Sequence, residues 1–121
     1  MILIDSTVWI DHIREANEIL AELLLEGRVL VHPFVVGEVA LGHIRNRDGV
    51  LRELRRLPAA LLARDDEVAA LIERERLFGL GVGYIGAHLL ASVRLTPDAK
   101  LWTLDKRLAA VAERRQGSAS F

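Results

Sequence analysis

The chain has 121 residues, of which 51% are hydrophobic and 27% charged, and its formal net charge is −1. This length suffices for one domain with a genuine core, and the composition favours a compact globule over a disordered chain. The sequence contains no cysteine, which excludes disulfides, thiolate metal sites and cysteine nucleophiles.

The spacing of apolar residues predicts short strands that alternate with helices. In chain order, the expected elements are a strand at 2–4, helices at 7–13 and 19–25, a strand at 28–31, helices at 33–44, 50–57, 65–77 and 83–93, a strand at 100–103 and a last helix from 105. Gly27 suits the C-cap of the second helix, and Pro33 suits the first turn of the third. Residues 59–63 fit either a strand or a connection, and 78–83 form a glycine-rich loop.

Strands alternating with helices predict an α/β domain with a mostly parallel sheet. There is no repeat, linker or low-complexity block, so we expect a single domain over residues 1–115. The remaining residues, 116–121, have no periodicity and are interpreted as a disordered tail. The start of the chain is apolar only as far as Asp5, so it does not predict a signal peptide. No apolar run reaches about 18 residues, the length of a membrane span, and we expect a cytoplasmic protein.

Two acids follow predicted strands. Asp5 comes directly after the first strand and Asp105 after the last. Because ligands of parallel sheets bind beyond the carboxyl ends of the strands, both acids are expected to face one crevice. Taken alone, either acid is explained equally well as the N-cap of the helix that follows it.

Glu38 is the third candidate. Its neighbours three and four positions away on the predicted helix are apolar residues or glycine. A carboxylate in such surroundings is costly unless it is paired or bound to a metal. The alternative is that Glu38 lies on a solvated edge of an amphipathic helix.

Three carboxylates without a thiolate suit a hard cation such as Mg²⁺ or Mn²⁺. Such an ion can activate water and stabilise the charge on a phosphate, which favours phosphodiester hydrolysis over peptide hydrolysis. The four histidines lack the spacing of a zinc protease, and each is expected to be a surface or cap residue rather than a ligand. They are His12, His32, His43 and His88.

Positive charge is concentrated in two places. Residues 45–56 carry five arginines against two acids, and a second basic group follows Asp105. The candidates for RNA binding are Arg45, Arg47, Arg52, Arg55, Lys106 and Arg107. Each group alone is explained as a solvated helix face, but two basic patches around an acidic centre suggest phosphate binding.

Four blocks of the sequence resemble, in order and spacing, those of PIN-domain ribonucleases, and most closely the VapC toxins of bacterial toxin–antitoxin pairs. The blocks are ILIDSTVWIDHI, HPFVVGEVALG, GVGYIGAHLLAS and KLWTLDKRLA. The resemblance covers residues 1 to about 112. It implies a three-layer α/β/α fold, cleavage of RNA that depends on Mg²⁺ or Mn²⁺, a homodimer, and inhibition by a VapB antitoxin.

The resemblance also implies roles for individual residues. Asp5, Glu38 and Asp105 match three of the four acids of the family, and they would be the catalytic and metal-binding residues. The hydroxyl residues beside them would orient water or ligands. These are Ser6, Thr7 and Thr103.

The remaining family acid belongs at position 86, where this chain has glycine. Glycine near a helix start costs about 1 kcal/mol relative to alanine and supplies no ligand. Because a two-metal arrangement needs carboxylates on both sides of the attacking water, we expect weak metal binding and poor or absent RNA cleavage. Selection against a harmful toxin, deliberate inactivation and natural divergence are all open as origins of Gly86.

Two rival interpretations follow. The first is a catalytically inactive PIN domain that acts only by binding its antitoxin, since Trp9, Phe34 and the apolar helices do not depend on Gly86. The second is a phosphoacceptor signalling domain. Such domains need an adjacent acid pair and a late lysine at a strand end, whereas Asp5 stands alone and Lys106 lies beyond Asp105.

Overall fold

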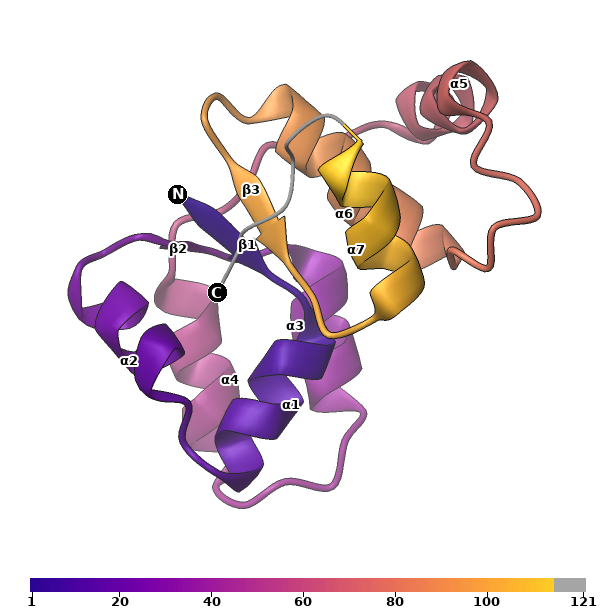
Figure 1. Ribbon diagram of the computed structural model, residues 1–121. Coiled ribbons are helices and arrows are strands. Elements are labelled where there is room, and N and C mark those ends of the chain that lie inside the picture. The colour runs from indigo at the N-terminus through magenta and orange to yellow at the C-terminus, as the bar shows by residue number, and fades with distance from the viewer. Residues whose placement is uncertain (115–121) are drawn as a thin grey trace.

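The computed structural model describes residues 1–114, and the tail expected at 116–121 lies outside them, as does residue 115. The described residues form three strands and seven helices (Figure 1). The strands are β1 (Ile2–Ile4), β2 (Val29–Leu30) and β3 (Lys100–Trp102). The helices are α1 (Ser6–Arg14), α2 (Glu18–Leu25), α3 (Pro33–Ala40), α4 (Arg47–Arg56), α5 (Asp65–Glu75), α6 (Tyr84–Leu95) and α7 (Lys106–Glu113).

The strands form one parallel sheet in the order β2-β1-β3, which confirms the predicted α/β class. Leu3 of β1 pairs with Leu30 on one side and with Leu101 on the other. The Asp5 N–H donates to the carbonyl of Trp102 at 2.9 Å, so the pairing of β1 with β3 continues to the residue after β1. The carboxyl ends of these two strands therefore meet at one edge of the sheet.

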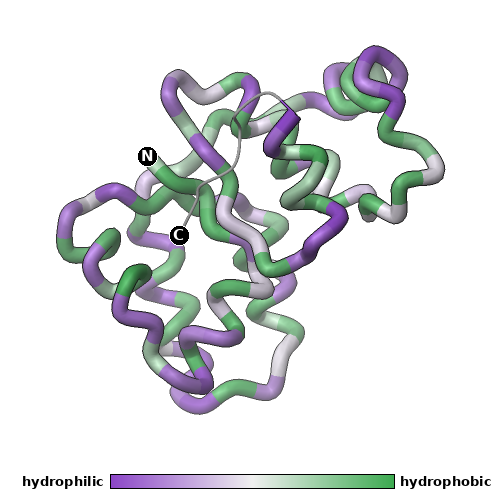
Figure 2. The backbone as a smooth tube through the Cα atoms, viewed as in Figure 1, coloured by the Kyte–Doolittle hydropathy of each residue, from purple (hydrophilic) through white to green (hydrophobic). Residues whose placement is uncertain are grey.

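Helices cover both faces of this sheet, giving the three-layer α/β/α arrangement (Figure 1). β2 and β3 lie on opposite sides of β1, and parallel crossovers are right-handed. The helices of the two connections must therefore lie on opposite faces. Figure 2 shows the hydrophobic segments running through the sheet, with hydrophilic stretches in the outer turns and loops.

The core lies between these layers. Its fully buried side chains come from every layer and include Leu3, Ile4, Val35, Leu89, Leu90 and Leu101. α5 packs against α6 at the edge of the molecule, through its buried residues Val68 and Leu71. An ion pair of 2.9 Å between Arg94 and the largely buried Glu75 adds to this contact.

Two boundaries differ from the sequence predictions by three residues or more. The helix expected over 33–44 ends at Ala40, where the Arg47 Nε donates to the free Ala40 carbonyl at 2.9 Å. α4 begins at Arg47 instead of 50, after Asn46 turns the chain with a φ of 51°. The undecided segment 59–63 is a connection, in which Ala59 makes one isolated bridge to Val31.

Two predicted helix ends are confirmed. Gly27 follows α2 with a φ of 67°, a left-handed conformation that glycine adopts without steric cost. Pro33 stands in the first turn of α3, and the residue before it, His32, is the N-cap. The His32 Nδ1 accepts the Phe34 N–H at 3.0 Å, so this nitrogen carries no proton.

His32 is almost fully buried, and this determines its titration. Burial, and secondly the neighbouring His88, lowers the pKa of His32 from 6.5 to about 4. Protonation of Nδ1 would also remove the acceptor that caps α3. The helix that carries Glu38 is therefore sensitive to acid.

We expect His32 to destabilise the fold as the pH falls from about 6.5 to 4. In that range the unfolded state binds a proton that the folded state does not, so the free energy of unfolding should decrease by about 2 to 3 kcal/mol. The variant His32→Asn keeps a capping acceptor but does not titrate, and its stability should depend less on pH. Urea unfolding of both chains between pH 4.5 and 7.5 measures the difference. Equal pH slopes in the two would contradict the assignment.

Candidate active site

Asp5 is the centre of the candidate site. It follows β1 at the sheet edge, and only 6% of its surface is exposed. The hydroxyls of Thr7 and Thr103 both donate to its Oδ2, at 2.8 and 2.6 Å. A buried carboxylate needs such donors, because it has lost its contact with water. Among the residues described, no donor contacts the other oxygen, Oδ1, which is left available to a ligand.

The backbone fixes the direction of these hydroxyl bonds. The Leu104 N–H donates to Thr7 Oγ1 and the Asp105 N–H donates to Thr103 Oγ1, both at 3.0 Å. Each hydroxyl thus accepts from the chain after β3 and gives its own proton to Asp5. These hydroxyls were expected to orient water or ligands, and in the structure they orient the carboxylate.

Glu38 reaches the same region from α3. It is half-buried, and the Ser6 hydroxyl donates to its Oε1 at 3.0 Å. Ser6 is buried in the first turn of α1, directly after Asp5. The apolar surroundings of Glu38 are thus compensated by a hydrogen bond that comes from the neighbour of the central acid.

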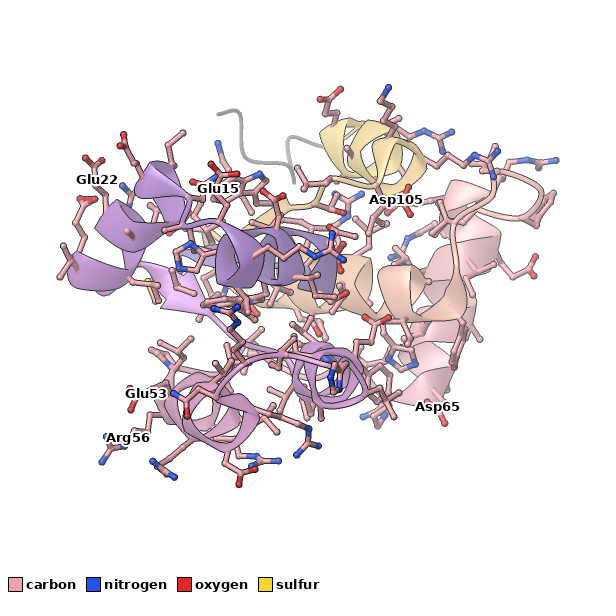
Figure 3. The ribbon with its side chains drawn as sticks, turned by 90° about the horizontal axis from the view of Figure 1, so that it is seen from below. Glu15, Glu22, Glu53, Arg56, Asp65 and Asp105 are labelled. Carbon is pink, nitrogen blue, oxygen red and sulfur yellow. The ribbon has the colours of Figure 1, made fainter. Side chains whose placement is uncertain are left out.

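Asp105 has the capping role that was considered for it. Its Oδ1 accepts the N–H groups of Arg107 and Leu108, at 2.9 and 3.2 Å, and caps α7. Asp5 also occupies an N-cap position, that of α1, but its side chain makes no cap hydrogen bond. Capping therefore accounts for the position of Asp105 and does not account for that of Asp5. Asp105 is exposed at the start of α7 (Figure 3).

Position 86 faces the same end of α7. A Cβ atom added to Gly86 would lie 3.3 Å from both methyl carbons of Leu108 and 3.4 Å from Val82 Cγ1. Since Leu108 belongs to the turn that Asp105 caps, a side chain at position 86 would start beside that turn. An acid there would require the Leu108 side chain to move by a few tenths of an ångström.

The donor set fits a hard cation, although not in the way the sequence predicted. In residues 1–114, no three acidic or histidine side chains lie close enough together to hold one ion, so the expected convergence of Asp5, Glu38 and Asp105 is not reproduced. Mg²⁺ is commonly held by one or two carboxylates and several waters. Asp5 with Glu38, or Asp5 with Asp105, would be the carboxylates to hold such an ion, through the oxygens for which the hydroxyls and the cap supply no donor.

Lys106 and Arg107 lie beside Asp105 in the first turn of α7 and are exposed. The Arg107 side chain crosses the loop before α6 so closely that a Cβ at Gly81 would overlap it, with Cδ only 2.6 Å away. Gly81 also has a φ of 79°, which favours glycine. Arg107 therefore packs on the glycine-rich loop, and its charge lies at the edge of the site.

The arginines of the other basic group lie elsewhere. Figure 3 shows Glu53 and Arg56 of α4 on the opposite side of the molecule from Asp105. Within this group, Arg47 is engaged with the Ala40 carbonyl and lies 3.6 Å from Asp48. The structure thus separates the two basic patches that were expected around one centre. Arg45, Arg52 and Arg55 are exposed at and before α4.

The sequence analysis did not predict a cluster of aromatic rings that includes a buried histidine. His88 is 3% exposed, so the expectation of a surface or cap residue was wrong for it, whereas His32 is a cap as expected. The ring of His88 lies edge-on to those of Phe34 and Tyr84, at centroid distances of 4.8 and 4.7 Å. The i, i+4 spacing of Tyr84 and His88 on a helix was the available signal.

The chain is similar to known proteins over most of its length. The family model described as PIN domain matches residues 2–114. Ribonuclease VapC32 of Mycobacterium tuberculosis, in strains CDC 1551 / Oshkosh and H37Rv, is 49% identical over 114 residues, which cover 93% of this chain and 92% of the relative. Within residues 1–114, no helix combines the length and apolar character needed to cross a membrane.

The variant Thr103→Val should weaken divalent metal binding. It removes the 2.6 Å hydrogen bond to Asp5 and the acceptor of the Asp105 N–H. Loss of such a supporting contact typically lowers metal affinity about 10- to 100-fold. Mn²⁺ titration followed by electron paramagnetic resonance measures the change.

Thr96→Val is the matched control, because the Thr96 hydroxyl bonds to Ser92 and Leu61, outside the site. Its Mn²⁺ affinity should equal that of the unmodified chain. Equal affinities in the two valine variants would refute the role given to Asp5.

Proposed function

Because this chain belongs to the PIN-domain family, we propose that it is a metal-dependent endoribonuclease and the toxin of a VapBC toxin–antitoxin pair. The observation that carries the proposal is Asp5, a buried carboxylate fixed at Oδ2 by two hydroxyls at the edge of a parallel sheet. The 49% identity to a protein named a ribonuclease supports it. Membership of this family favours a nuclease over the phosphoacceptor alternative.

Each side chain of the site has its own role in metal or RNA binding. Asp5 would hold the ion through Oδ1, and Glu38 or Asp105 would be a second ligand. When bound, Mg²⁺ or Mn²⁺ supplies the acidity that activates water and stabilises charge on the phosphate. Ser6 keeps Oε1 of Glu38 in place, so that the other carboxylate oxygen can face the ion or its water. Lys106 and Arg107 offer positive charge to the RNA backbone beside Asp105.

Gly86 reduces this activity. Without a carboxylate at this position, the side of the site next to α7 has one ligand fewer, and the attacking water is not flanked by acids on both sides. The methyl carbons of Leu108 lie 3.3 Å from the Cβ position of the missing side chain. The missing carboxylate supports the second candidate function, an inactive PIN domain that only binds its antitoxin.

The partners belong to the same proposal. We assign the chain an RNA substrate, a VapB-like antitoxin and a homodimeric state, in the cytoplasm where these partners occur. Exposed apolar side chains support a surface that another protein covers, since Leu41 is 89% exposed and Leu61 and Leu62 more than half.

The comparison of Gly86→Asp with Gly86→Asn tests the activity. Both variants crowd Leu108 equally, but only aspartate restores the charge. On total cellular RNA with Mg²⁺, we expect weak or absent cleavage by the unmodified chain, at least about tenfold faster cleavage by Gly86→Asp, and no gain from Gly86→Asn. Sequencing the cleaved ends identifies the target. Equal rates for the unmodified chain and Gly86→Asp would overturn the role of Gly86.

The catalytic acids are tested in the Gly86→Asp chain. Glu38→Gln should lower its cleavage rate about 100-fold or more, because a ligand or base is lost. Glu53→Gln is the matched control, since Glu53 is exposed on α4, across the molecule. Unchanged cleavage in Glu38→Gln would refute the site. Binding of a VapB-like antitoxin with no cleavage by either chain would establish the inactive alternative.

A further inference from the structure

A small hollow lies between the C-terminal end of α5 and the start of α6. Its volume is about 200 Å³, and its walls include the rings of Phe78 and Tyr84 and the backbone of Gly79 and Gly83. Both rings are more than half exposed. A Cβ atom added to either glycine would meet nothing within 4 Å, so the space directly beside these two glycines is open.

Both aromatic walls are held in place by neighbours. The ring of Tyr84 stands at 84° to the ring of His88, which is itself buried and packed against Phe34. The guanidinium of Arg76 lies 5.6 Å from the centroid of the Phe78 ring. The hollow therefore has one aromatic wall that packs on a buried histidine and a second aromatic wall that carries a cation.

The hollow adjoins the candidate active site. Val82 lines it, and the Cγ1 of the same residue is 3.4 Å from the Cβ position of residue 86. One side chain thus separates the hollow from the place where a family acid is expected. A group bound in the hollow would lie next to the phosphate on which the site acts.

We propose that this hollow binds one unpaired base of a single-stranded RNA next to the scissile phosphate. Proteins that bind unpaired RNA stack its bases on aromatic side chains, and the backbone follows positive charge. Phe78 and Tyr84 supply the aromatic rings, and Arg76 supplies positive charge for a neighbouring phosphate. The glycines that line the hollow have no side chains, which leaves space for a planar base. The volume suits one base and excludes a base pair. The proposal rests on the proposed function, and it makes Tyr84 and Phe78 binding residues for the substrate.

The direct test uses RNA oligonucleotides with the fluorescent base 2-aminopurine at successive positions, added to the full chain in EDTA so that no cleavage occurs. Stacking quenches this base, and we expect quenching at one position of the RNA. Tyr84→Ala and Phe78→Ala should each weaken binding about tenfold, as loss of a stacking ring does, whereas Tyr84→Phe keeps the affinity. Leu25→Ala, an exposed residue on α2, is the control and should bind normally.

Gly83→Val tests the hollow without removing a ring. The backbone of Gly83 has a φ of −75°, which valine adopts, and its side chain would enter open space. This variant should fold, as thermal melting can verify, and should lose the quenching. It therefore separates a filled hollow from a damaged fold, which Tyr84→Ala alone could cause.

Three results would overturn the proposal. The first is RNA binding of normal affinity by both Gly83→Val and Tyr84→Ala. The second is the absence of 2-aminopurine quenching by the unmodified chain. The third is a loss of RNA binding that accompanies a change in oligomeric state, measured by sedimentation. The last would show that the hollow receives another protein chain. The binding assay needs no cleavage, so the two proposals can fail separately. Quenching without nuclease activity, even in the Gly86→Asp chain, would refute the proposed function alone. Cleavage by the Gly86→Asp chain that is unaffected by filling the hollow would refute this proposal alone.

Discussion

The site depends on the two hydroxyl hydrogen bonds to Oδ2 of Asp5. They join the end of β1, the first turn of α1 and the segment after β3, and each is oriented by a backbone N–H from that last segment. A buried carboxylate without such partners would be costly, so the hydroxyls both permit its burial and fix its direction. What they leave free is one oxygen at the edge of the sheet, where ligands of parallel sheets bind.

Gly86 affects the proposed chemistry of the site more than it affects the fold. The fold does not require a side chain at position 86. Glycine there lowers the stability of the helix by about 1 kcal/mol relative to alanine, and Leu108 packs closely against it. The chemistry has no substitute for a carboxylate there, because the nearest described side chains are those of Leu108 and Val82. Under the proposed function, the chain keeps the architecture of a PIN domain with one ligand fewer, so its stability and its activity can be changed separately.

The alternation of strands and helices, the parallel sheet and the meeting of Asp5 with the end of β3 could be predicted, because buried strands and their carboxyl ends leave a strong local signal. The end of α3 at Ala40 could not, since the group that satisfies the Ala40 carbonyl is a side chain seven residues later. Nor could the direction of the Thr7 and Thr103 hydroxyls, the separation of the basic patches, or the contact of Gly86 with Leu108. These depend on how distant segments pack, which periodicity does not record.

The central claim is that Asp5 is the residue around which a divalent ion is held. Crystals of the chain soaked in Mn²⁺ and measured at the manganese absorption edge test it most directly. We expect an anomalous peak within coordination distance of Oδ1 of Asp5, on the side that faces Glu38 or Asp105. A well-ordered peak elsewhere, with Oδ1 of Asp5 bound only to water, would contradict it.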